Sequence, residues 1–197
     1  MNHTALIKCF LWACFFALVA WGVASLGADP DFVFDKFLSA GFFMLLLILY
    51  GRFRLNLKLI IPVVFAVGLH QAKLYGAVFF GFIQFDMVMH VVGAFAVALV
   101  VYQWLIHEER SVRHWKKVAF LTILVVMGFG AVLEIVEFFG YANLPEGGGI
   151  LHYGEGDEGG WSDTAQDMMF NAVGTVVGVM VMCLITVRKN KRMVIGE

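Results

Sequence analysis

Six long apolar stretches constrain the fold of this chain more than any other feature. A helix that crosses a bilayer needs about 20 predominantly apolar residues, and each stretch is near that length. Hydrophobic residues make up 61% of the 197 positions, against roughly 45 to 50% in an average soluble domain. We therefore predict an all-α polytopic membrane helix bundle with about six transmembrane helices, in a single domain over residues 1–197. The predicted spans are 5–26, 33–50, 57–75, 84–106, 116–140 and 163–187.

Charged residues divide between alternate connections and predict the orientation. Short cytoplasmic connections of membrane proteins carry an excess of Lys and Arg. Three segments are basic and would share the cytoplasmic side: Arg52, Arg54 and Lys58; Arg110, Arg113, Lys116 and Lys117; Arg188, Lys189, Lys191 and Arg192. The other connections carry Asp29, Asp31, Asp35, Glu146, Glu155, Asp157 and Glu158, with few basic residues beyond Lys36 and Lys73. Both termini are therefore predicted to be cytoplasmic.

Seven polar residues lie inside the last three apolar stretches, close to their predicted outer ends. An ionisable side chain in hydrocarbon costs about 2.5 to 3.5 kcal/mol on insertion scales, so a cluster of them indicates a functional site. The predicted orientation brings all seven to one side of the membrane, in a layer that three helices can share. They are Asp86 and His90; Glu134 and Glu137; and Asp163, Asp167 and Asn171.

The last helix combines these polar residues with glycines on one face. At about 100° per residue, Asp163, Asp167, Asn171, Gly174 and Gly178 form one stripe. Gly174 and Gly178 make a small-xxx-small pattern, which permits close helix approach in lipid. The acidic stripe is therefore predicted to point into the protein.

Helix capping is the simpler explanation for two of the acids. Asp163 with Gln166 fits an N-cap with its capping-box partner, and Asp86 fits an N-cap as well. Capping does not explain Asp167 and Asn171, which lie deeper in the same stripe. The set as a whole therefore still predicts a polar pocket.

Several carboxylates in one layer repel each other unless protons or a cation neutralise them. Oxygen ligands with one imidazole suit Zn²⁺, Mn²⁺, Fe²⁺, Mg²⁺ or Ca²⁺. We predict a divalent metal site in which Glu134 and Glu137 also serve as catalytic groups, and in which Asn171 and His152 support the ligands or the substrate. The predicted metal ligands are Asp86, His90, Glu134, Glu137, Asp163 and Asp167.

Three functions fit such a pocket. The first is a metal-dependent hydrolase or transferase site that acts on or binds an envelope lipid or a lipid-linked substrate. The second is a small ion- or proton-coupled transporter, because acids within the membrane also mark ion pathways. The third is a non-catalytic membrane interaction protein. Membrane lipids are the expected partners, and the basic C-terminal segment predicts contact with anionic lipid rather than nucleic acid.

Two connections are less regular. The glycine-rich segment 141–162 predicts either a flexible cover above the pocket or a solvated acidic connector. The apolar stretch from Ala77 to Ile83 is too short to span a membrane and predicts a re-entrant or interfacial turn.

The polar segments also resemble a known family. Phe85-Asp86-Met-Val-Met-His90-Val-Val-Gly93, Leu133-Glu134-Ile-Val-Glu137 and Trp161-Ser-Asp163-Thr-Ala-Gln-Asp167-Met-Met-Phe-Asn171-Ala-Val-Gly174 resemble the bacterial YjdF-like inner-membrane proteins and, more remotely, the VanZ-like proteins. The resemblance covers about residues 84–180 and implies a multi-helix protein of the bacterial inner membrane. It carries over to the six predicted metal ligands. The chain departs from the pattern at Phe138 and Phe139, where the family pattern is rich in tryptophan.

Overall fold

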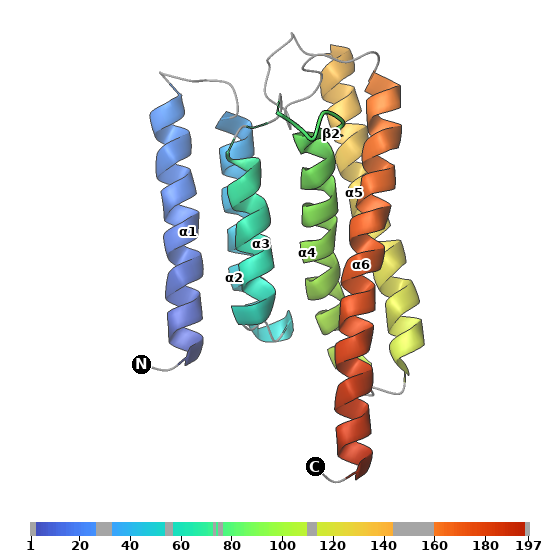
Figure 1. Cartoon of the computed structure of the whole chain (residues 1–197). Helices are drawn as coiled ribbons and strands as arrows, with labels where there is room; N and C mark the ends of the chain where they lie inside the picture. The colour runs from blue at the N-terminus through green and yellow to red at the C-terminus, as the bar shows by residue number, and fades with distance from the viewer. Residues whose placement is uncertain are drawn as a thin grey trace.

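The computed structural model describes residues 3–26, 33–53, 57–72, 74, 77–109, 114–143 and 160–195. In these residues the chain forms six α-helices and one short antiparallel hairpin (Figure 1). The predicted all-α membrane bundle is confirmed. The elements are α1 His3–Ser25, α2 Val33–Phe53, α3 Leu57–His70, β1 Val78–Phe79, β2 Ile83–Gln84, α4 Phe85–Glu108, α5 Trp115–Asn143 and α6 Gly160–Ile195.

Successive helices run up and down, so that both chain ends lie at the same end of the bundle (Figure 1). We call the opposite end, where α4 and α6 begin and α3 and α5 end, the distal end. Among the described residues, four helices, α1, α4, α5 and α6, are long and apolar enough to cross a membrane by length and composition. The 14-residue α3 is shorter, about 21 Å at a rise of 1.5 Å per residue, and contains Pro62.

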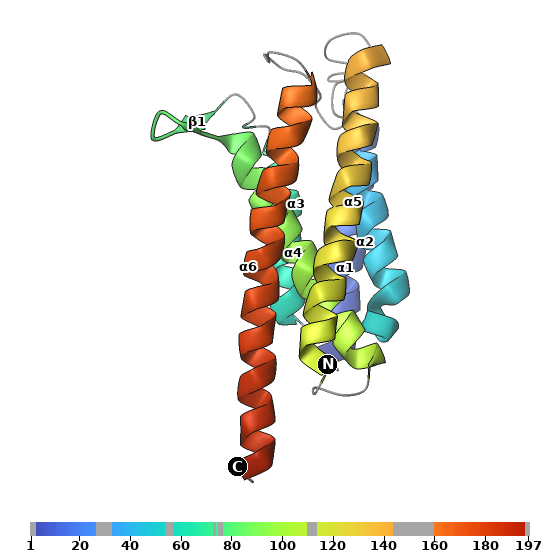
Figure 2. The same cartoon turned by 90° about the vertical axis from the view of Figure 1, so that its right-hand side faces the viewer.

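Helices α4, α5 and α6 pack against one another, while α1 packs on α2 and α3 lies against α4 (Figure 2). One apolar core extends from α1 and α2 through α3 to α4, with Leu11, Phe43, Ile60 and Tyr102 fully buried or nearly so. A second, smaller core of Ala94, Ala98, Val101, Val126 and Val179 joins α4, α5 and α6. The polar site lies at the distal end of this three-helix unit.

At the opposite end of the bundle, an ionic cluster joins the end of α4 to the start of α5. Glu109 pairs with the Lys117 ammonium and with His114, whose Nδ1 lies 3.0 Å from a Glu109 carboxylate oxygen. Hydrogen bonding to Lys117, and to a lesser extent to His114, lowers the pKa of Glu109. The pairs are solvent-exposed, so their contribution to stability is small.

The predicted small-residue stripe of α6 is confirmed as a packing surface. A Cβ added at Gly174 would overlap the backbone carbonyl of Val91, and one added at Gly178 would lie 2.9 Å from the Ala98 Cβ. Helices α4 and α6 therefore approach almost to backbone contact, which only residues without a side chain permit.

We predict that Gly174→Ala destabilises the protein, because the new methyl group overlaps the rigid backbone of α4. Overpacking of this kind typically costs about 1 to 3 kcal/mol. Gly128→Ala is the matched control, since a Cβ at Gly128 meets nothing within 4 Å. Thermal unfolding followed by circular dichroism in detergent should show a lower melting temperature for Gly174→Ala alone. Equal melting temperatures would contradict the close α4–α6 contact.

Candidate metal centre

His90 lies at the centre of the distal polar site and meets carboxylates from three helices. Its Nε2 is 3.5 Å from Asp86 Oδ1 on α4 and 3.4 Å from Asp167 Oδ1 on α6. Its Nδ1 is 3.3 Å from Glu134 Oε1 on α5. The imidazole therefore has one carboxylate on one nitrogen and two on the other.

Helix geometry explains how these residues meet. Asp86 and His90 are four residues apart on α4 and thus lie on the same helix face. Capping does not account for Asp86 or Asp163, because both lie inside the first turn of their helices. The N-cap of α4 is Gln84, whose side chain makes no capping hydrogen bond. The N-cap interpretation of these two acids is therefore wrong.

Glu134 is held in place from a second side. Asn171 Nδ2 donates a 3.0 Å hydrogen bond to Glu134 Oε1, the same oxygen that faces His90. Thr175 Oγ1 donates to the Asn171 carbonyl oxygen at 2.7 Å. The Glu134 residue is only 2% exposed, and its second oxygen, Oε2, has no hydrogen-bond partner among the described residues. Oε2 of this buried carboxylate is thus available to accept a further hydrogen bond.

Asp86, His90 and Asp167 each offer one ligand atom, and these three atoms lie within 4.8 Å of one another. Two carboxylates and an imidazole at this separation are a donor set that fits a divalent cation. The other predicted ligands are placed differently. Glu134 faces the opposite nitrogen of His90, and Glu137 lines the adjoining cavity. Asp163 lies one turn beyond Asp167 towards the distal end, and His152 falls outside the described residues.

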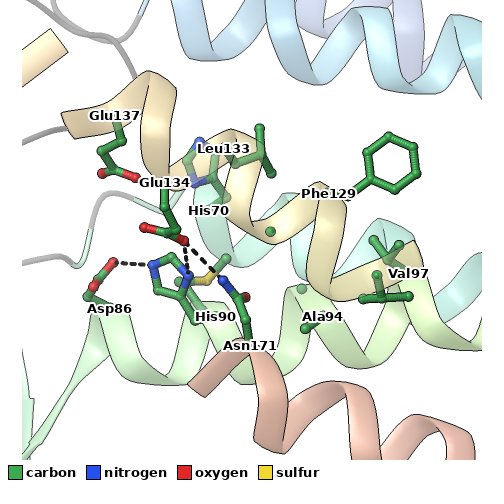
Figure 3. Close-up of a pocket in the computed structure, with 14 residues that line it drawn as sticks. His70, Asp86, His90, Ala94, Val97, Phe129, Leu133, Glu134, Glu137 and Asn171 are labelled. Atoms are coloured by element: carbon green, nitrogen blue, oxygen red, sulfur yellow. Dashed lines mark hydrogen bonds and ion pairs between the residues drawn. The ribbon is translucent and has the colours of Figure 1, made fainter. Parts of the chain in front are cut away.

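A cavity of about 220 Å³ opens beside the site, between α4 and α5 (Figure 3). Its polar end is formed by Asp86, His90, Glu134, Glu137 and Asn171. Apart from His70, the rest of its wall is apolar. Figure 3 shows Ala94, Val97 and Phe129 on the side away from the carboxylates. The cavity is therefore amphipathic, with its polar end at the distal end of the bundle.

A second buried polar cluster on α2 and α3 was not predicted. The charge pattern of the sequence groups Asp35 and Lys36 with an outer connection, but both lie in the first turn of α2, where they are 1% and 0% exposed. His70 Nε2 is 4.0 Å from Asp35 Oδ2. Gln71 Nε2 donates to Ser39 Oγ at 3.1 Å.

His70 connects this cluster to the main site. It lines the amphipathic cavity, as Glu134 does (Figure 3). It also lines a second cavity of about 190 Å³ between α2, α3 and α4. The two cavities share the lining residues His70, Met89, Gly93 and Val97. This arrangement could have been predicted from the orientation of the helices, because α2 begins and α3 ends at the distal end, where the other polar groups lie.

The comparisons with known proteins place the chain in a family. A family model described as "Predicted membrane protein (DUF2238)" matches residues 7–189. The chain belongs to this family. YjdF is also a member, so the YjdF-like resemblance is confirmed, while the more remote likeness to VanZ-like proteins stays a prediction. No curated protein and no solved structure matches the chain. The family supports a membrane protein, and the particular membrane remains predicted from the sequence.

We predict that Asn171→Asp destabilises the protein, because it replaces the amide donor with a second carboxylate about 3.0 Å from Glu134 Oε1. A hydrogen bond to a charged group contributes roughly 1.5 to 3 kcal/mol, and the loss should be at least that large. Equilibrium unfolding in mixed detergent micelles measures it. The exchange variant Glu134→Gln with Asn171→Asp restores one donor and one acceptor. It should recover part of the loss, and a purely additive double variant would contradict the contact.

Proposed function

We propose that the distal site binds a divalent metal ion through Asp86, His90 and Asp167, and that the protein uses it to bind or act on an envelope lipid or lipid-linked substrate. The proposal rests on one observation: the two nitrogens of His90 face different carboxylates. Nε2 faces the Asp86 and Asp167 carboxylates, while Nδ1 faces Glu134. Metal-binding histidines characteristically direct one nitrogen to the ion and the other to a carboxylate that orients the ring.

Glu134 fits the orienting role better than the role of a ligand. Its Oε1 is engaged by both His90 and Asn171. We therefore revise the sequence-based assignment and treat Glu134 as a positioning residue. Glu137, which lines the cavity, is the better placed carboxylate to accept a proton from water or substrate. A bound divalent ion would polarise a phosphoryl or carbonyl oxygen.

The shape of the cavity supports a lipid-like substrate. Asp86 at its polar end and Val97 in its apolar part are eleven residues apart on α4, which corresponds to about 16 Å along the helix. The predicted orientation turns the polar end towards the outer headgroups and the apolar part towards the hydrocarbon. An amphiphile in the outer leaflet would have the same polarity.

We predict that purified protein binds one divalent ion per chain, measured by isothermal titration with Zn²⁺ and with Mn²⁺. Asp167→Asn should abolish measurable binding because it removes a ligand. Glu134→Gln should weaken binding by about 10- to 100-fold, as expected for a residue that orients a ligand. Asp35→Asn is the matched control, a buried carboxylate of the other polar cluster, and should bind like the wild type. Absence of stoichiometric binding to the wild-type protein would refute the metal site.

We predict that Gly93→Leu weakens binding of the lipid acyl chain in the cavity and leaves the metal affinity of the site unchanged. Gly93 lines both cavities and a Cβ there meets nothing within 4 Å, so the side chain enters open space. If the leucine side chain displaces two methylene groups of the acyl chain, the lost burial of about 0.8 kcal/mol per group weakens lipid binding roughly tenfold. The measurement is cross-linking of a phospholipid with a diazirine in its acyl chain, in nanodiscs, mapped to peptides of α4 and α5.

Gly128→Leu is the control for Gly93→Leu, since Gly128 also has open space around its Cβ and does not line either cavity. Metal affinity should be unchanged in both variants. Equal cross-linking of the cavity peptides in the two variants would show that the acyl chain binds elsewhere.

Proton-coupled transport is the second candidate, and the His70–Asp35 pair is the observation that favours it. His70 of this pair lines the cavity that already contains His90 and Glu137, so the pair adds protonatable groups next to that site. Acids and histidines in series within a membrane are typical of proton pathways. Transport of this kind needs no stoichiometric metal, so the titrations described above separate the two candidates.

A further inference from the structure

The hairpin between α3 and α4 displays apolar side chains with little cover. Its turn residues Phe80 and Phe82 are 87% and 73% exposed, and Val78 and Phe79 are exposed as well. No charged residue occurs from Ala77 to Phe85. Large exposed apolar patches of this kind mark contacts with protein or with membrane.

The choice of residues is not explained by the turn itself. Phe80 and Gly81 have φ values of 53° and 78°, so both central residues of the turn are left-handed. Gly, Asn and Asp suit such positions, whereas a bulky residue in this region is uncommon and strained. Phe80 therefore occupies a position that turn geometry disfavours, at the most exposed point of the hairpin.

Part of the hairpin backbone is hydrogen-bonded internally, which lowers the cost of bringing it to the lipid interface, where water and headgroups can bind the remaining polar groups. Beyond the two strand pairs, hydrogen bonds close the turn and connect the hairpin to the start of α4. The pairs are Val78 with Gln84 and Phe79 with Ile83, and the further bonds are Phe82 N to Phe79 O at 3.2 Å and Phe85 N to Ala77 O at 2.9 Å.

The position of the hairpin favours lipid over water. Figure 2 shows it reaching sideways from the start of α4 rather than continuing along the bundle axis. In both views α5 and α6 extend further at the distal end than the hairpin does (Figures 1 and 2). The hairpin thus lies beside membrane-spanning helices, at a level that these helices pass.

We propose that the Phe79–Phe82 hairpin inserts into the lipid interface at the distal side of the membrane and holds the start of α4 at headgroup depth. Phe79 contacts the Phe85 ring at a centroid distance of 6.3 Å, and Phe85 is the buried first residue of α4. Asp86 of the polar site follows directly. The occupant of the exposed aromatic surface is the bilayer itself, and the role of the hairpin does not depend on the metal or substrate of the site.

Spin-label accessibility in nanodiscs tests this directly. The label is attached at Phe80→Cys, and separately at Phe82→Cys, in full-length protein whose Cys9, Cys14 and Cys183 are replaced by alanine. Leu184→Cys is the lipid-facing control and His114→Cys the water-facing control; these side chains are similarly exposed, at 58% and 56%. The ratio of collisions with oxygen to collisions with a nickel chelate should be several-fold higher at both hairpin positions than at His114.

A ratio equal to that at His114 would overturn the proposal, because it places the hairpin in water. A label that is immobilised, with a dipolar coupling between two labelled copies, would overturn it in favour of a contact between chains. The two hairpin positions are independent variants, so misfolding of one, detected by size exclusion, leaves the other to decide.

Discussion

The contact of His90 with three carboxylates is the interaction on which the distal half of the bundle depends. It connects α4, α5 and α6 through one side chain. In a membrane, the hydrophobic effect gives helices little drive to associate, because lipid chains are as apolar as the helix surfaces. A polar connection of this kind therefore specifies which helices meet and in what register. The same low-water setting makes each uncompensated charge costly, so the carboxylates require a neutralising proton or cation.

The two buried polar clusters share the distal half of the molecule, although they belong to different helices. Asp35 and Lys36 come from α2, and His70 and Gln71 from the end of α3. His70 contributes to both cavity walls, so α3 adds a residue to a cavity whose other lining residues come from the last three helices. Helix α2 lines the second cavity through Leu38, Ser39 and Phe42.

Much of this arrangement could be predicted from the sequence, because helical period and connection charges are strong signals in membrane proteins. They gave the six helices, the convergence of Asp86, His90, Glu134 and Asp167, and the inward face of Gly174. Other features depend on details that helical periodicity in the sequence does not show. His70 and Asp35 lie at helix ends, where polar residues resemble ordinary connection residues, and the two-residue strands of the hairpin are too short to show alternation. The hydrogen bond from Asn171 to Glu134 depends on side-chain rotamers.

The close approach of Gly174 to Val91 has a consequence for how the site responds to its surroundings. Val91 directly follows His90, and Gly174 is two turns after Asp167 on α6. The close backbone contact between α4 and α6 therefore lies near His90 and Asp167, two of the proposed metal ligands. Membrane helices tilt when bilayer thickness changes. A pair fixed at backbone distance tilts as one rigid body, whereas helices separated by long side chains can slide past each other. The spacing of His90 and Asp167 is therefore expected to be insensitive to the thickness of the lipid around it.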